Sequence, residues 1–130
     1  MTNTELVQSA FENFSKGNVA GILDMISDDI VWDMNGPDII PYAGSRKNKA
    51  EVMDFFAKIA ATSDFQKFEP QVFVAEGDKV VAMGVAVATV KQTGKQATNR
   101  WAMCWTFKDG KAIQYYNYSD TYALAESFMQ

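Results

Sequence analysis

The sequence predicts an α+β fold in which helices come first and a four-stranded antiparallel meander follows. Three segments in the first half carry apolar residues at helical spacing, whereas the chain after Pro70 is rich in β-forming residues. Helices that are segregated from a run of strands are typical of α+β proteins. No linker, repeat or low-complexity tract interrupts the chain, so residues 1–130 are expected to form one domain. The hydrophobic content of 48% is ample for its core.

The first helix is expected to begin at Thr2, because Thr2 and Glu5 have the spacing of a capping box. Gly17 is expected to end it, and a second short helix follows over about residues 19–26. The apolar residues that would bury the first helix share one face: Leu6, Val7, Ala10, Phe11 and Phe14.

The next segment has an extended pattern before the third helix begins. Residues 30–34 predict a strand, and residues 39–42 predict a short strand or a loop that ends at Gly44. Asn48, with Glu51 three residues later, predicts the start of the third helix. Its buried stripe would contain Val52, Met53, Phe55, Phe56, Ile59 and Ala60.

Three turn signals divide the second half into four strands: residues 76–78, 92–94 and 108–110, each of which contains glycine. The segment 80–90 is almost continuously apolar, although an antiparallel sheet with one wet face should alternate. Both of its faces are therefore expected to be covered, and the three helices can cover only one. A second copy of the chain is expected on the other face, as a homodimer through the sheet.

Composition excludes several classes of function. A net charge of -4, with no basic cluster longer than residues 46–49, argues against binding to nucleic acid. No apolar run is long enough to span a membrane, and the polar N-terminal segment is not expected to serve as a signal peptide. The single cysteine, Cys104, fits a reducing cytoplasm. Histidine is absent, which removes the commonest general base and metal ligand. We expect a cytoplasmic protein without metal, cofactor, nucleic-acid or membrane partner.

Three stretches of sequence resemble the nuclear-transport-factor-2-like superfamily, which includes SnoaL-like proteins and ketosteroid isomerase. They are residues 17–22 together with 27–32, residues 41–44 before the third helix, and residues 109–120 with their Tyr-Tyr-Asn-Tyr-Ser-Asp ending. The resemblance implies a cone-shaped α+β roll, with three N-terminal helices packed on a curved antiparallel sheet around an apolar pocket. It also implies a small hydrophobic ligand of polyketide-, terpenoid- or steroid-like character.

The resemblance leaves two functional classes open. One is a cofactor-free isomerase, cyclase, dehydratase or hydrolase, and the other is a domain that holds its ligand without catalysis. In ketosteroid isomerase the base is a carboxylate on the first strand, and a gap-free match places Met34 there and Asp33 one residue early. A one-residue gap would make Asp33 the catalytic base, and Asp38 is the other candidate. In the same match, Ala10 and Met103 occupy the positions of the ketosteroid isomerase groups that stabilise the enolate intermediate, and neither side chain can donate a hydrogen bond.

With Trp32 and Met34 facing inward, one cavity open at one end is expected. Its predicted ligand-binding residues are Trp32, Met34, Tyr42, Phe56, Trp101, Met103, Tyr115 and Asn117. Asn117 stands in a strand of tyrosines, where β propensity disfavours asparagine. A buried amide needs a partner, so Asn117 is expected to bond either a neighbouring tyrosine or the ligand.

Overall fold

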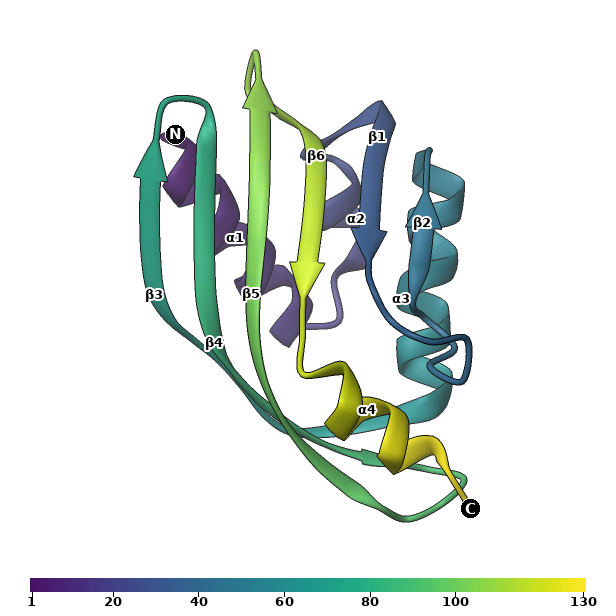
Figure 1. Cartoon of the computed structure of the whole chain (residues 1–130). Coiled ribbons are helices and arrows are strands. Elements are labelled where there is room, and N and C mark those ends of the chain that lie inside the picture. Colours follow the sequence, from purple (N-terminus) through teal and green to yellow (C-terminus); the bar gives the residue numbers. More distant parts are fainter.

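The computed structural model describes residues 1–130 and contains four helices and one six-stranded sheet, ordered β2-β1-β6-β5-β4-β3. The elements in chain order are α1 (Asn3–Ser15), α2 (Val19–Leu23), β1 (Ile26–Met34), β2 (Gly44–Arg46), α3 (Lys49–Thr62), β3 (Ser63–Glu76), β4 (Lys79–Val90), β5 (Gln96–Lys108), β6 (Lys111–Tyr118) and α4 (Thr121–Phe128). Helices α1, α2 and α3 lie behind the sheet in Figure 1, and the long strands β3, β4 and β5 bend strongly at their lower ends. The predicted α+β roll, with three N-terminal helices on a curved and mostly antiparallel sheet, is confirmed.

The helix starts follow the capping signals in the sequence. The backbone N–H of Glu5 donates to Thr2 Oγ1 at 3.1 Å, and the Glu5 carboxylate accepts from the Thr2 backbone N–H at 2.8 Å. Gly17, with φ of 71°, lies just beyond the end of α1. Helix α2 ends at Leu23, earlier than predicted, because Ile26 already pairs with Ala112 of β6.

The four-stranded meander is confirmed, with antiparallel pairing from β3 through β6. Its three turns place Gly77, Gly94 and Gly110 at φ of 60°, 73° and 77°, a region that glycine enters without strain. Strand β3 begins at Ser63, however, well before Pro70. Because β3 is an edge strand, Pro70 can lie within it although it has no N–H to donate.

The segment between α2 and α3 differs from the prediction. Strand β1 begins at Ile26 rather than residue 30, so Asp28 and Asp29 lie within an exposed, irregular part of the strand. Residues 39–42 form turns, and the short strand β2 comes after them and pairs with the end of β1. Strand β1 also pairs in parallel with β6, a contact between distant segments that local patterns do not report.

Side chains on the inner face of the sheet become smaller along the strands. Near one end, Trp32, Tyr115 and Trp105 are cross-strand neighbours in β1, β6 and β5. Towards the bent ends of β4 and β5, the inward residues that line the cavity are small: Ala86, Ala88 and Ala97. This gradient in size fills one end of the roll with aromatic rings and leaves space over the other.

Helix α4 covers the bent ends of the strands (Figure 1). Asp120 caps it, because Asp120 Oδ1 accepts the backbone N–H of Ala123 at 3.1 Å. The hydroxyl of Thr93, in the β4–β5 turn, donates to the backbone oxygen of Ser127 at 2.6 Å. No helix has both the length and the apolar character that crossing a bilayer requires.

Candidate functional site

A cavity of about 80 Å³ lies between the helices and the inner face of the sheet. A cavity of roughly 10–15 Å³ on this measure holds one water molecule, so the space exceeds that of a single water several times. Twenty-three residues line it, of which 20 are hydrophobic and none is charged. The three polar lining residues are Asn99, Asn117 and Ser119.

The structure brings together all eight residues that the sequence nominated for the cavity. They come from β1, the segment before β2, α3, β5 and β6, and each lines the cavity: Trp32, Met34, Tyr42, Phe56, Trp101, Met103, Tyr115 and Asn117. The ring of Trp32 stacks on Tyr115 with centroids 3.7 Å apart and meets the edge of Trp105 at 5.7 Å. Trp105 also lines the cavity, although it was not among the nominated residues.

Phe65 is the one exposed residue among those that line the cavity. Phe65 packs against Phe14 of α1 at 5.6 Å and Phe68 of β3 at 5.7 Å between ring centroids. Phe14 and Phe68 are themselves half-buried lining residues. Three mutually packed aromatic rings therefore form this part of the cavity wall.

A short chain of hydrogen bonds runs along the wall that β6 forms. Asn117 Nδ2 donates to the hydroxyl of Tyr115 at 2.9 Å, and Ser119 Oγ donates to Asn117 Oδ1 at 2.6 Å. The structural partner expected for Asn117 is therefore present. Burial raises the pKa of Tyr115 far above its ordinary value, and the hydrogen bond from Asn117 offsets this only in part.

The second buried hydroxyl belongs to Tyr42. Burial raises the pKa of Tyr42 to about 12, against a smaller lowering effect of its hydrogen bond with Ser63. Both hydroxyls stay protonated near neutral pH, so the cavity wall presents hydroxyl groups but no negative charge. No three histidine, cysteine or carboxylate side chains gather closely enough to bind a metal ion.

Several N–H groups on the wall have no acceptor. The buried Nε1 atoms of Trp32, Trp101 and Trp105 make no hydrogen bond within the chain. Asn99, which sequence reasoning missed, is buried on the same face of β5 as Trp101, and its Oδ1 accepts the Asp120 backbone N–H at 2.7 Å. Because side chains alternate along a strand, residues 99 and 101 of β5 share one face, and this spacing could have identified Asn99 as a lining residue from the sequence.

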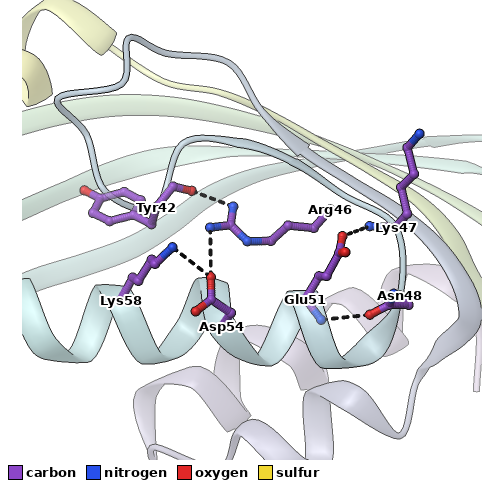
Figure 2. Close-up of polar contacts among 7 residues, drawn as sticks. All are labelled: Tyr42, Arg46, Lys47, Asn48, Glu51, Asp54 and Lys58. Atoms are coloured by element: carbon purple, nitrogen blue, oxygen red, sulfur yellow. Dashed lines mark hydrogen bonds and ion pairs between the residues drawn. The ribbon is translucent and has the colours of Figure 1, made fainter.

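Arg46 fixes the segment that carries Tyr42 (Figure 2). Its Nη1 donates to the Tyr42 backbone oxygen at 3.0 Å, its Nη2 lies 3.5 Å from Asp54 Oδ2, and its guanidinium lies 5.3 Å from the centre of the Phe55 ring. Lys58 also contacts Asp54, at 3.0 Å, and this hydrogen bond is the main reason that the pKa of Asp54 is lowered. Arg46 therefore ties the turn before β2 to α3 and holds Tyr42 in the cavity wall.

Replacing Arg46 by methionine is expected to lower the free energy of unfolding by about 1–3 kcal/mol, because the buried Tyr42 carbonyl loses its donor. Lys58→Met is the control, since Lys58 contacts the same carboxylate from an exposed position. It should cost less than about 1 kcal/mol. Urea unfolding followed by circular dichroism measures both variants, and equal losses would show that Arg46 is not a buried clamp.

Comparison with known proteins identifies the family. The model of the SnoaL-like domain matches residues 7–115, which is most of the chain. The chain belongs to the SnoaL-like family. No curated protein sequence matches it.

Solved structures agree with this assignment. An NTF2-like protein from Burkholderia xenovorans LB400 is 28% identical, with a TM-score of 0.89 over 98% of this chain and 95% of its own. TerC, solved with polyporic acid, is 25% identical, with a TM-score of 0.84 over 97% of both chains. An NTF2-like protein from Burkholderia thailandensis E264 shares the fold, with 22% identity and a TM-score of 0.90 over 100% of this chain and 99% of its own.

The two carboxylates considered as bases in this SnoaL-like domain do not line its cavity. Asp33 alternates with Trp32 and Met34, so its side chain lies on the opposite face of β1, beside Ser45 and Tyr116. Asp38 is exposed in the turns before β2. The register that turns Trp32 and Met34 inward therefore turns Asp33 away from the cavity.

Proposed function

We propose that this SnoaL-like domain binds a small, uncharged, hydrophobic organic molecule with aromatic, polyketide-like character. The observation that carries the proposal is the absence of any charged residue among the 23 that line the cavity. Moving a charge into such surroundings without a partner is costly, so an ionised ligand is disfavoured. The stacked rings of Trp32 and Tyr115, which form part of the wall, favour a flat ligand.

A related structure supports a small organic ligand. TerC was co-crystallised with polyporic acid, and TerC matches this domain over 97% of either chain. A small organic molecule is therefore a reasonable ligand for the corresponding cavity of this domain.

We further propose that the domain holds its ligand without acid–base catalysis. An isomerase, dehydratase or hydrolase needs a group that takes a proton near neutral pH. The titratable groups on the cavity wall are the hydroxyls of Tyr42 and Tyr115, whose raised pKa values keep them protonated. Asp33 and Asp38 lie outside the cavity. Catalysis here would be limited to positioning a reactive ligand.

Titration with indane, an uncharged bicyclic hydrocarbon, tests the binding proposal. All three tryptophans of the chain line the cavity, so their fluorescence reports its occupancy. We expect saturable binding at one site. Ala86→Phe, which places a ring in the cavity, is expected to weaken binding at least tenfold, or about 1.4 kcal/mol.

The matched control is Ala57→Phe, which adds the same ring at an exposed position of α3 and should leave affinity unchanged. If Ala86→Phe impairs folding, Ala88→Leu fills the cavity nearer its surface, because Ala88 is a half-buried lining residue. Wild-type affinity in a folded cavity-filling variant would contradict binding inside the cone.

We also propose that two copies of the domain pair through the outer face of the sheet. Its exposed apolar side chains lie in one cross-strand row that also contains Ala102, with Val72 44%, Met83 39% and Tyr118 55% exposed. The charges beside this patch, Glu69 and Arg100, flank Val85 in one cross-strand row, so the face carries both signs and can complement itself. Cys104 on this face is a free thiol, which fits the reducing cytoplasm where we propose that the domain works.

The wild-type domain is therefore expected to have twice the 14.5 kDa mass of one chain in light scattering at micromolar concentration. Val85 faces outward and Ala86 inward, so Val85→Asp is the variant that places a charge in the interface. It should give folded monomers, because burying the new carboxylate in the interface, even beside Arg100, costs more than the pairing of the two charges returns. Ala57→Asp, on exposed α3, should stay dimeric. A monomeric wild type would contradict the proposed dimer.

A further inference from the structure

The side chain of Asn99 has one free end, and its orientation is fixed. Asn99 Oδ1 accepts the backbone N–H of Asp120 at 2.7 Å, the residue that caps α4. Because this contact needs an oxygen, it determines which end of the amide is the NH₂ group. Asn99 is 9% exposed and lines the cavity, and its Nδ2 makes no hydrogen bond within the chain. The two N–H donors of this amide are therefore left unused within the chain.

The surroundings of Asn99 leave room for a ligand atom. Its cross-strand neighbour on β4 is Ala86, whose methyl group fills little of the space at this point of the inner face. Two residues along β5, Trp101 presents a buried Nε1 that also has no acceptor. Unpaired N–H donors on consecutive inward positions of one strand thus border the roomier end of the cavity.

The oxygen atoms of the lining amides are already engaged. Asn117 Oδ1 accepts from Ser119, and Asn99 Oδ1 accepts from Asp120. The lining amides therefore offer a bound molecule a free donor but no oxygen without a partner. A molecule with a carbonyl or ether oxygen would satisfy this donor, whereas a donor such as an amine would have to share an amide oxygen that already accepts a hydrogen bond.

We propose that Asn99 is the specificity-determining residue of the cavity, donating an Nδ2–H hydrogen bond to a carbonyl or ether oxygen of the bound molecule. The Nε1–H of Trp101 is the second donor in reach of this end of the cavity. The inference rests on the proposed function, because it requires a ligand in the cavity. It adds the chemical feature by which that ligand is selected.

Two probes of the same shape test this role: indane, and 1-indanone, which differs by one carbonyl group. Burying a carbonyl group that has no hydrogen-bond donor is costly, so a cavity without a donor would bind indane more tightly than 1-indanone. Because Asn99 supplies a donor, the wild-type domain is expected to bind 1-indanone at least as tightly as indane. Asn99→Leu is expected to weaken 1-indanone about tenfold, or 1.4 kcal/mol, and to change the affinity for indane less than about twofold. A general loosening of the cavity would weaken both probes, so the ratio of the two dissociation constants isolates the donor.

The variant Asn99→Asp keeps an oxygen for the Asp120 N–H and replaces the NH₂ group with a carboxylate oxygen, which cannot donate to a carbonyl, so it replaces Asn99→Leu if that variant does not fold. We expect Asn99→Asp to shift the ratio of the two dissociation constants in the same direction, with 1-indanone weakened relative to indane. A ratio that both folded variants leave at its wild-type value would overturn the role of Asn99 while leaving the proposed function intact. If the wild type binds neither probe, the proposed function fails and this inference fails with it.

Discussion

Replacing Trp32 by alanine is expected to lower the free energy of unfolding by about 3–5 kcal/mol. Trp32 is 1% exposed and is the largest side chain that is fully buried. Its ring contacts the rings of Phe55, Phe56, Trp105 and Tyr115, so its removal leaves a cavity between α3 and three strands of the sheet. Such a void is costly because the surrounding rings belong to elements that relax only partly.

Urea unfolding at equilibrium measures this effect. Tyr122→Ala is the control, since it removes an aromatic ring that is 77% exposed on α4 and should change stability by less than about 1 kcal/mol. A loss below about 1 kcal/mol for Trp32→Ala would mean that Trp32 does not anchor β1 to α3.

Adding a single methyl group at Gly84 is expected to cost about 1–3 kcal/mol or more. A Cβ atom at this position would overlap the backbone oxygen of Glu69, and it would lie 2.6 Å from Trp101 Cζ2 and 2.9 Å from Pro70 Cα. Two of these atoms belong to the backbone of β3, so a side-chain rotation cannot relieve the overlap. The ring of Trp101, which stacks on Phe68 at 5.1 Å, would be displaced from the cavity wall.

Gly21→Ala is the matched control, because the added methyl group meets only the ends of the Asn13 and Asn18 side chains. Within α2 it also gains helix propensity, so a change of less than about 1 kcal/mol is expected. Equal stability of Gly84→Ala and the wild type, measured by urea unfolding, would show that β3 and Trp101 do not pack closely around Gly84.

Local patterns in the sequence predict much of this fold. The capping residues Thr2 and Asn48 mark two helix starts, and each side chain accepts a backbone N–H in the structure. The Asp-Gly turn before β6 has Asp109 at φ of 51° and Gly110 at 77°, the positive values that such a tight turn requires. These features depend on neighbours within a few residues, which is why the sequence reports them.

Features that depend on distant pairing were predicted less well. The start of β1 depends on its parallel contact with β6, and β3 begins in a polar stretch that becomes a strand through its pairing with β4. Arg46 belongs to a basic run that suggests an exposed surface, yet it is 7% exposed because Asp54 and the Tyr42 carbonyl face it. The free donor of Asn99 depends on its contact with Asp120, far along the chain.

NMR tests most directly whether the ligand cavity lies inside the cone. The measurement records the three tryptophan indole N–H resonances while indane is added. Trp32, Trp101 and Trp105 all line the cavity. We expect all three indole resonances to shift in a saturable way, while the backbone amides of the outer-face residues Met83 and Val85 stay in place. Indole resonances that remain fixed at saturating indane, or shifts confined to the outer face, would contradict binding inside the cone.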